Sequence, residues 1–330
     1  MKKIMTLCIL LFAIISNNGF TKVIWDKNKN QWYDTRSGMY YDQVRKLWYN
    51  PRTGHTARPG GYNSSNNNSL NDNENKNSGS AQNTNVSSSL NEIVNGFNQI
   101  HRKYGVRVHY RRFRPSRYAR RYTRWQYLTN ADNVKLKKLG KILIRVFNKY
   151  PVDFIRKTKL RAIALVKNMS VQGQKRGAMP DAYGEVLYLS TSIVLSYSKT
   201  YTEHVIHHEY YHMIEQQFNG SMYYKDPRWV SLNVPGTRYG RGGMYMRNPS
   251  IAWKKHPAKG FVNGYSTSAV EEDKAEVFAF LMTPDEYRKV LKWMRTDLVL
   301  RAKFNYMKRF LYGKSKEFTE SYFNRNARLN

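Results

Sequence analysis

His208 and His212 stand four positions apart, and Glu209 directly follows the first of them. On an α-helix, residues four apart share one face, so the two imidazoles can reach the same zinc ion at about 2.0–2.1 Å. Glu209 then lies about 100° round the helix axis, beside the ion and not on it. Zinc acidifies a bound water, and a nearby carboxylate takes the proton as that water attacks a carbonyl carbon. These residues predict metal-assisted hydrolysis with Glu209 as the general base.

Apolar residues surround this HExxH motif and favour a helix over residues 202–217. Val205 and Ile206 precede the motif, and Met213 and Ile214 follow it. The two middle positions are uncharged tyrosines, and no proline interrupts the segment. The alternative is a surface helix that carries its histidines by chance.

The third ligand of the site must come from another part of the chain, because a catalytic zinc ion takes three protein ligands and keeps one position open. Glu272 is preferred over its neighbour Glu271 as the candidate, since Glu272 and Glu276 stand one helical turn apart on one face. Ser268 can cap this downstream helix, with Glu271 closing a capping box. Alternatively, Glu271, Glu272 and Asp273 are only the acidic first turn of this helix, where the positive end of the helix dipole favours negative charge. That alternative leaves Glu276, which an apolar run follows, without an explanation.

The two segments together resemble the gluzincin metallopeptidases related to anthrax lethal factor. The match extends in pattern from residue 90 onward and is sharp at residues 205–214 and 260–282. In that family the first glutamate of an E-x-x-A-E stretch is the third zinc ligand, which implies Glu272. The second glutamate supports a ligand histidine, which implies Glu276. A tyrosine seven residues before the ligand glutamate faces the substrate oxyanion, which implies Tyr265.

The resemblance also implies a fold, a cofactor and a substrate. It implies an α+β, zincin-like domain with an active-site helix and a small mixed sheet over residues 90–330, holding one Zn²⁺ per chain. Such an enzyme binds an extended protein or peptide substrate across the metal. The strand expected at residues 185–189 would be the edge strand to which that peptide adds.

Two further histidines flank the motif. His204 stands one turn before His208 on the same face, and His207 directly precedes His208. His204 can reach substrate or the rim of the site, but such histidines are more often structural or exposed. We therefore expect both to lie outside the ligand set.

The elements that must position these residues follow from periodicity and from breakers. Asp132 is expected to cap a long amphipathic helix that Pro151 stops, and a long loop is expected over residues 219–267. Two helices are expected to close the chain. The remaining expectations are a helix near residues 90–102 and strands at residues 106–110, 160–166 and 185–189.

The start of the chain is typical of a secretion signal over residues 1–20. Lys2 and Lys3 precede an apolar run over residues 4–15. That run is shorter than the roughly 20 residues that span a bilayer, so no transmembrane span is expected. Cys8 is the only cysteine, and a mature chain without it forms neither a disulfide nor a cysteine-ligated metal site. We expect a monomer that is secreted, periplasmic or held in the cell envelope.

Residues 21–54 contain an aromatic repeat. Trp25, Tyr33, Tyr41 and Tyr49 recur every eight residues, which predicts four short strands joined by tight turns. The pattern resembles the octamer repeat (OCRE) of RNA-processing proteins, and we carry over its architecture and not its function. Residues 55–89, rich in Asn and Ser, cannot bury enough surface to offset their ordering entropy and are expected to be a disordered linker.

The charge balance favours anionic partners. Lys and Arg total 56 against 23 Asp and Glu, a net charge of +33. Residues 102–124 are especially rich in arginine, with aromatic residues interleaved. The alternatives are a solvated arginine-rich loop and a charge that only keeps the protein in solution. The sequence thus predicts a secreted zinc endopeptidase, and alternatively a catalytically silent zincin-fold protein that binds nucleic acid or envelope glycan through residues 102–124.

Overall fold

The chain forms two compact units in a computed structural model. One comprises Met1–Lys76 and the other Asn77–Asn330. The structure describes residues 23–26, 31–34, 39–42, 47–49, 56–57, 79–246 and 248–328, so the predicted signal over residues 1–20 lies outside it. None of the described helices is both long enough and apolar enough to cross a bilayer.

The first unit is an antiparallel meander in its described parts. The four predicted repeat strands are present, and Tyr33 lies opposite Tyr40 with the ring centroids 4.7 Å apart. Such cross-strand aromatic pairs stabilise a sheet that has little core of its own. The fifth strand, β5, falls inside the range expected as linker. The strands are β1 (Val23–Asp26), β2 (Gln31–Asp34), β3 (Met39–Asp42), β4 (Leu47–Tyr49) and β5 (Thr56–Ala57).

The second unit is built on a mixed sheet with a long central strand, β8 (Ala162–Val171). Its first half pairs in parallel with β6 and β11, and its second half pairs antiparallel with β7 and β9. Its first five residues are all buried, as expected for a strand covered on both faces. The α+β class with a small mixed sheet is therefore confirmed. The other strands are β6 (Arg107–His109), β7 (Thr123–Tyr127), β9 (Gln174–Lys175), β10 (Ala178–Asp181) and β11 (Val186–Ser190).

The edge strand beside the active-site helix differs from the prediction. The strand expected at residues 185–189 is β11, which lies inside the sheet between β8 and β10. The edge strand is β10, which packs against the active-site helix. β10 has four residues and contains Pro180, which has no backbone N–H to donate to a neighbouring strand. Proline is therefore found in edge strands and rarely in inner ones. For these reasons sequence periodicity did not reveal it.

Helices cover the sheet, whose apolar residues lie in a main core and in a second, smaller cluster with Ala119 of the helix over residues 117–122. The longest of them are α1 (Gly79–Tyr104), which begins inside the range expected as linker, and α3 (Asn133–Asn148). Asp132 does precede α3, but its carboxylate accepts hydrogen bonds from the Thr129 backbone and from Lys167 and does not cap the helix. The short helices are α2 (Arg117–Tyr122), α4 (Val152–Lys157) and α5 (Thr191–Val194).

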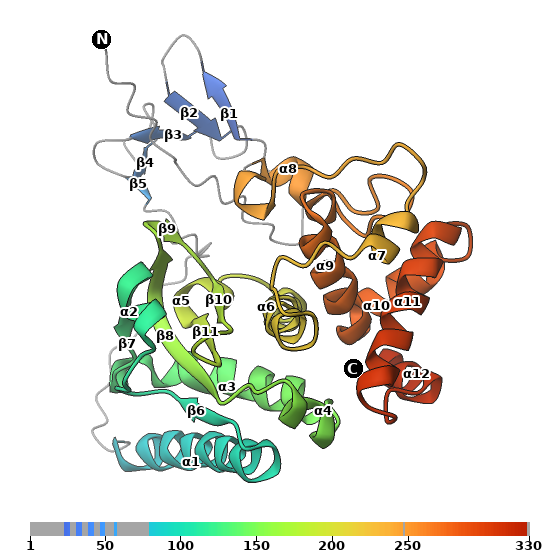
Figure 1. Ribbon diagram of the computed structural model, residues 1–330. Helices are drawn as coiled ribbons and strands as arrows, with labels where there is room; N and C mark the ends of the chain where they lie inside the picture. The colour runs from blue at the N-terminus through green and yellow to red at the C-terminus, as the bar shows by residue number, and fades with distance from the viewer. Residues whose placement is uncertain are drawn as a thin grey trace. The chain divides into compact units, whose positions relative to one another are not determined.

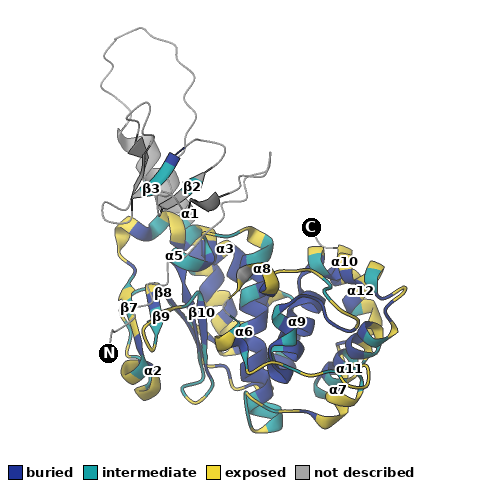
Figure 2. Cartoon of the chain, turned by 90° about the horizontal axis from the view of Figure 1, so that it is seen from above, coloured by how far each residue is buried: buried dark blue, intermediate teal, exposed yellow. Residues whose placement is uncertain are grey.

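Two buried helices, α6 (Lys199–Asn219) and α9 (Val270–Met282), lie side by side between the sheet and a helical layer. Figure 1 shows the strands on the left, α6 in the middle and α9 to α12 on the right. Figure 2 shows that α6 and α9 are buried along most of their length. The Ser198 hydroxyl caps α6 at its start, and Gly220 ends it with a φ of 80°.

The C-terminal region holds more helices than the two expected. Four follow one another from residue 270, because Pro284 begins a new helix directly after α9 and the Asp297 carboxylate caps another. After α9 come α10 (Pro284–Trp293), α11 (Leu298–Lys314) and α12 (Glu320–Arg328).

The long loop between α6 and α9 is held in place by a buried carboxylate of α9. Buried Asp273 on α9 accepts hydrogen bonds from Trp229 at 2.8 Å and Tyr239 at 2.7 Å, and pairs with Lys303 at 2.7 Å. Because both charges are fully buried, they need these partners to remain there. The loop contains α7 (Pro227–Ser231), η2 (Gly243–Tyr245), α8 (Pro249–Ala252) and η3 (Tyr265–Thr267).

Candidate metal centre

Three side chains from α6 and α9 converge on one point. The Nε2 atoms of His208 and His212 are 3.3 Å apart. Glu272 Oε2 lies 3.1 Å from the first and 3.5 Å from the second. Donors at about 2.0–2.1 Å from a tetrahedral zinc ion lie about 3.3–3.4 Å from one another. The three separations therefore suit one zinc ion with a fourth position left for water or substrate.

The surroundings of this triad favour positive charge. His208 and His212 are 7% and 8% exposed, and Glu272 is partly buried. Burial lowers the pKa of His208, but contacts with Glu272 and Glu276 outweigh it and raise that pKa well above its usual range. Burial likewise raises the pKa of Glu272, while the two histidines pull it well below its usual range. A divalent cation would satisfy the same field.

Glu276 contacts Nδ1 of His208, the ring nitrogen that does not face Glu272. Its Oε1 lies 2.9 Å from His208 Nδ1, a close charge contact that falls short of full hydrogen-bond geometry. Its Oε2 accepts a hydrogen bond from Asn263 at 2.5 Å. A carboxylate on the second nitrogen of a ligand histidine fixes the tautomer and the direction of the ring. The geometry thus places the Glu276 carboxylate between His208 and Asn263.

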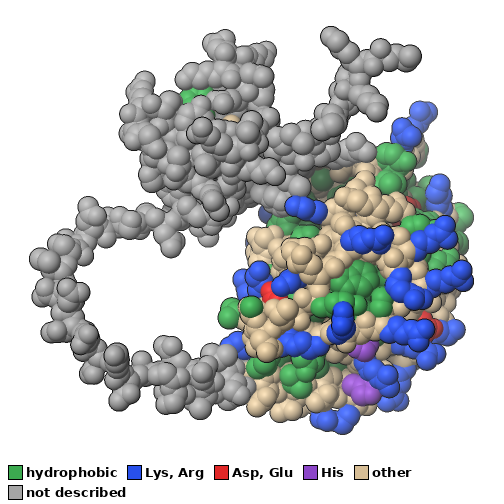
Figure 3. All heavy atoms as spheres, turned by 90° about the vertical axis from the view of Figure 1, so that its left-hand side faces the viewer, with side chains coloured by type: hydrophobic (Ala, Val, Ile, Leu, Met, Phe, Trp, Pro, Cys, Tyr) green, Lys and Arg blue, Asp and Glu red, His purple; other side chains and the backbone are tan. Residues whose placement is uncertain are grey.

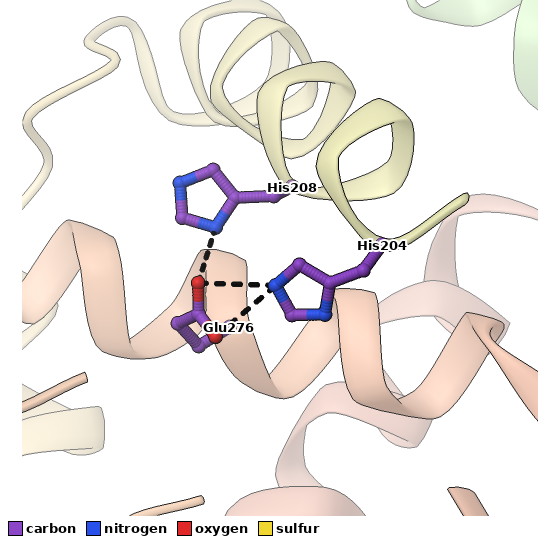
Figure 4. A group of neighbouring side chains, drawn as sticks. All are labelled: His204, His208 and Glu276. Carbon is purple, nitrogen blue, oxygen red and sulfur yellow. Dashed lines mark hydrogen bonds and ion pairs between the residues drawn. The ribbon is translucent and has the colours of Figure 1, made fainter. Parts of the chain in front are cut away.

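His204, which was expected outside the ligand set, contacts the same network. Its Nε2 lies 3.2 Å from Glu276, as Figure 4 shows, and its Nδ1 lies 2.7 Å from Glu286 on α10. Burial lowers the pKa of His204, but the two carboxylates raise it overall to about 10. The signal for its role was the recurrence of histidine every four residues at positions 204, 208 and 212.

His204, His208 and Glu276 form a second group whose donor atoms lie close enough to hold a metal ion. This group is buried throughout, whereas Glu272 in the first group is partly exposed. The Glu276 carboxylate already has His204, His208 and Asn263 around it. We therefore assign the second group to support of the first.

His207 points away from the metal triad. Its Nδ1 lies 2.5 Å from the Tyr150 hydroxyl, and the ring is fully buried. Burial, reinforced by the charges of Lys149 and His204, holds its pKa well below its usual range. His207 is thus a neutral core residue, which agrees with its expected place outside the ligand set.

Glu209 and Tyr265 remain available at the edge of the triad. Glu209 is partly exposed, and among the described residues its carboxylate makes no hydrogen bond or ion pair. The Tyr265 ring centroid lies 5.8 Å from that of His208. Burial and the charges of Glu272 and Glu209 raise the pKa of Tyr265 well above its usual range, so its hydroxyl stays protonated. It can therefore donate a hydrogen bond.

The expected cap of α9 does not form. Ala269 is the residue that precedes the helix, and no side chain caps its first turn. The Ser268 hydroxyl is buried and has no hydrogen-bond partner among the described residues, and Glu271 does not close a box with it. The Ser268 carbonyl instead accepts a hydrogen bond from Gly242 at 2.8 Å. Ser268 ends η3 with helical backbone angles, whereas a capping residue has extended ones.

The long loop between α6 and α9 brings Gly243 against the triad, which the sequence did not reveal. The loop is held by Gly240, which donates to Thr267 at 2.9 Å, and by Gly242. A Cβ at Gly243 would overlap the Tyr265 hydroxyl and the Glu272 carboxylate. Only glycine fits this position without moving the site.

Comparisons with known proteins add little to this description. No protein-family model matches the chain, and no curated protein matches it. Among solved structures, the chain is similar to a Bacteroides caccae protein provisionally assigned as a zinc-binding metallopeptidase. The TM-score is 0.45 at 17% sequence identity, covering 74% of this chain and 93% of that one. The evidence for function therefore comes from the residues of the site.

Proposed function

We propose that this chain is a zinc-dependent peptidase of the gluzincin type, with His208, His212 and Glu272 as the ligands. The observation that carries the proposal is the convergence of two imidazole nitrogens and one carboxylate oxygen at 3.1, 3.3 and 3.5 Å from one another. An unpaired glutamate, Glu209, stands next to the first ligand. This set matches three-ligand catalytic zinc sites.

In the proposed hydrolysis, Glu209, Tyr265 and Glu276 have separate roles. When bound, zinc would polarise the scissile carbonyl and lower the pKa of a coordinated water to about 7. Glu209 takes the proton of the attacking water on a carboxylate oxygen and passes it to the departing amine nitrogen. The Tyr265 hydroxyl donates a hydrogen bond to the carbonyl oxygen as negative charge develops there. Glu276 keeps the His208 ring in line.

The edge strand β10 offers a place for an extended protein or peptide substrate. It packs beside α6, and only its inner side pairs with β11. A peptide that adds to this edge would gain main-chain hydrogen bonds while its scissile bond crosses the metal triad. We propose that the enzyme is exported, since residues 1–20 are typical of a secretion signal.

The test uses the full chain. Zinc per chain would be measured in the purified protein, followed by cleavage of a broad peptide library with and without a chelator. We expect about one zinc per chain and cleavage that stops on chelation and returns with added zinc. Folded protein that takes up no zinc would exclude the metallopeptidase assignment.

A second candidate function rests on the basic face. None of the Lys and Arg residues in the range 102–124 forms an ion pair with a carboxylate in the described part of the chain. Figure 3 shows many basic and few acidic side chains on the side that carries α2 and β7. This candidate is a silent zincin fold that binds anionic polymers, nucleic acid or envelope glycan. Salt-sensitive polyanion binding by zinc-loaded protein that cleaves no peptide would favour it.

A further inference from the structure

A second cavity lies apart from the metal triad, where α3 ends and where α6 and α10 begin. Its volume is about 370 Å³. Basic side chains line it from two of these helices, Arg145 and Lys149 from α3 and Lys199 from α6. Ligand sites commonly occupy about 300–1,000 Å³, so the cavity suits a small molecule.

Both carboxylates that line the cavity already have partners within the protein. Glu203 pairs with Arg145 and lies 3.5 Å from Lys149. Asp285 pairs with Arg288 and accepts a hydrogen bond from the Thr200 hydroxyl at 2.9 Å. Two carboxylates, Glu203 and Asp285, therefore line the cavity with three cations, and Asp285 is also paired with Arg288 outside it, so positive charge is left over.

Lys149 shows this surplus most directly. Its side chain is 6% exposed, yet its ammonium has only two contacts, at 3.5 Å to Glu203 and 3.4 Å to the Met282 carbonyl. Both are long for a group with three donors. Burial, together with repulsion from Arg145 and Lys199, lowers the pKa of Lys149 to about 8. Among the described residues, the carboxylate nearest this ammonium is that of Glu203, which Lys149 shares with Arg145.

Buried donors without partners gather at the same place. Thr283 lines the cavity at 1% exposure, and its hydroxyl has no hydrogen-bond partner among the described residues. Nε of Arg145 is buried and likewise unpartnered. Native proteins satisfy almost all buried polar groups, so these two donors can each still take an acceptor. The helix dipoles do not decide the field, since α6 and α10 start at this cavity while α3 and α9 end there.

We propose that this cavity binds a small molecule carrying a phosphate-class oxyanion. Lys149 and Arg145 would pair with the oxyanion, and the Thr283 hydroxyl would donate a hydrogen bond to it. The proposal uses no residue of the metal triad, and it stands or falls independently of the peptidase assignment.

The test is a calorimetric titration of the full chain with inorganic phosphate at low ionic strength. Lys149→Met removes the buried ammonium, and Lys138→Met removes an exposed one from the same helix as the matched control. We expect one saturable site in the parent chain. Loss of a charge-assisted hydrogen bond predicts binding weaker by about 10-fold or more in Lys149→Met, with less than about a twofold change in Lys138→Met.

Thr283→Val supplies a second readout that preserves side-chain shape and leaves every charge in place. It is expected to weaken phosphate binding several-fold, and it decides the matter if Lys149→Met fails to fold. Equal weakening by the two lysine variants would show only diffuse attraction to a protein of +33 net charge. That result, or no saturable phosphate binding by the parent chain, would overturn the proposal.

Discussion

Two histidine–glutamate clusters lie one helical turn apart on α6 and α9, and they differ in what their side chains touch. In the first cluster, His208 Nε2, His212 and Glu272 converge on one point, and Glu272 is partly exposed. In the second, His204, His208 Nδ1 and Glu276 are enclosed and contact one another, as Figure 4 shows. The same residue types thus give a site open to a ligand in one case and a closed support in the other.

His208 belongs to both clusters, and this shared ring explains why they are adjacent. Its Nε2 faces Glu272, and its Nδ1 faces Glu276. Each carboxylate contacts one side of the ring, so under the proposed function the closed cluster would orient a ligand of the open one. The difference teaches that availability of donor atoms, and not residue type, separates ligands from supports. The experiments below probe that separation, from the largest expected effect to the smallest.

Removing a ligand should abolish zinc binding. Glu272→Ala leaves only two ligands, so we expect zinc to fall from about one per chain to nearly none, with peptidase activity lost. Glu271→Ala is the matched control, because Glu271 is the preceding residue on α9 and does not converge on the triad. Elemental analysis of both purified variants checks this. Equal zinc in the two variants would contradict the assignment of Glu272.

Removing the general base should stop chemistry and leave the metal in place. Glu209→Gln keeps the size of the side chain and loses its basicity, so kcat should fall by about 10²–10⁴-fold. Zinc content should be unchanged, because Glu209 contacts none of the three ligands. Peptide cleavage measured beside zinc content checks the expectation. Loss of zinc in this variant would instead place Glu209 on the metal.

The closed cluster should contribute to stability. His204→Leu leaves the Glu276 and Glu286 carboxylates without the cation between them. Breaking a buried ion pair by removing one partner costs about 3–5 kcal/mol, which urea denaturation measures. His101→Leu, an exposed histidine on α1, is the control and should change the free energy of unfolding by less than about 0.5 kcal/mol. Similar losses of unfolding free energy in His204→Leu and His101→Leu would show that His204 in the closed cluster contributes no more to stability than an exposed histidine.

The link between the clusters should have a smaller, graded effect. Glu276→Gln weakens the hold on His208 and should reduce zinc affinity by about 10–100-fold while occupancy at saturating zinc is kept. Glu286→Gln acts one step further from the triad, through His204, and should have a smaller effect. Competition with a chelator measures both affinities. An equal or larger effect of Glu286→Gln would show that His208 is not oriented through Glu276.

The half of the site that lies within one helix was predictable from the sequence. His208, Glu209 and His212 depend only on the regular geometry of α6, so their spacing fixes where they point. The position of Glu272 depends on how α9 packs beside α6, and the resemblance supplied it where spacing alone left alternatives. The α+β class was predictable for a similar reason, because helical and strand periodicities are local properties.

Features that depend on several distant segments were not predictable. His204 gains its role from Glu286 on a third helix, and Gly243 reaches the triad from a long loop whose path no periodicity describes. The edge strand was expected at residues 185–189 by analogy with the family that the chain resembles, whereas the edge strand of the structure, β10, is short and contains Pro180. In each case a tertiary contact decided the outcome, and one sequence does not encode such contacts in a readable pattern.

The burial of α6 on almost every side has a consequence for the motions of the molecule. Amide hydrogens in its central turns can exchange with solvent only when the surrounding layers open together. Glycine-rich segments of the following loop have more exposed backbone and should exchange far sooner. The slowest-exchanging region would then contain His208 and His212, which we propose as metal ligands, and the loop would exchange without displacing them.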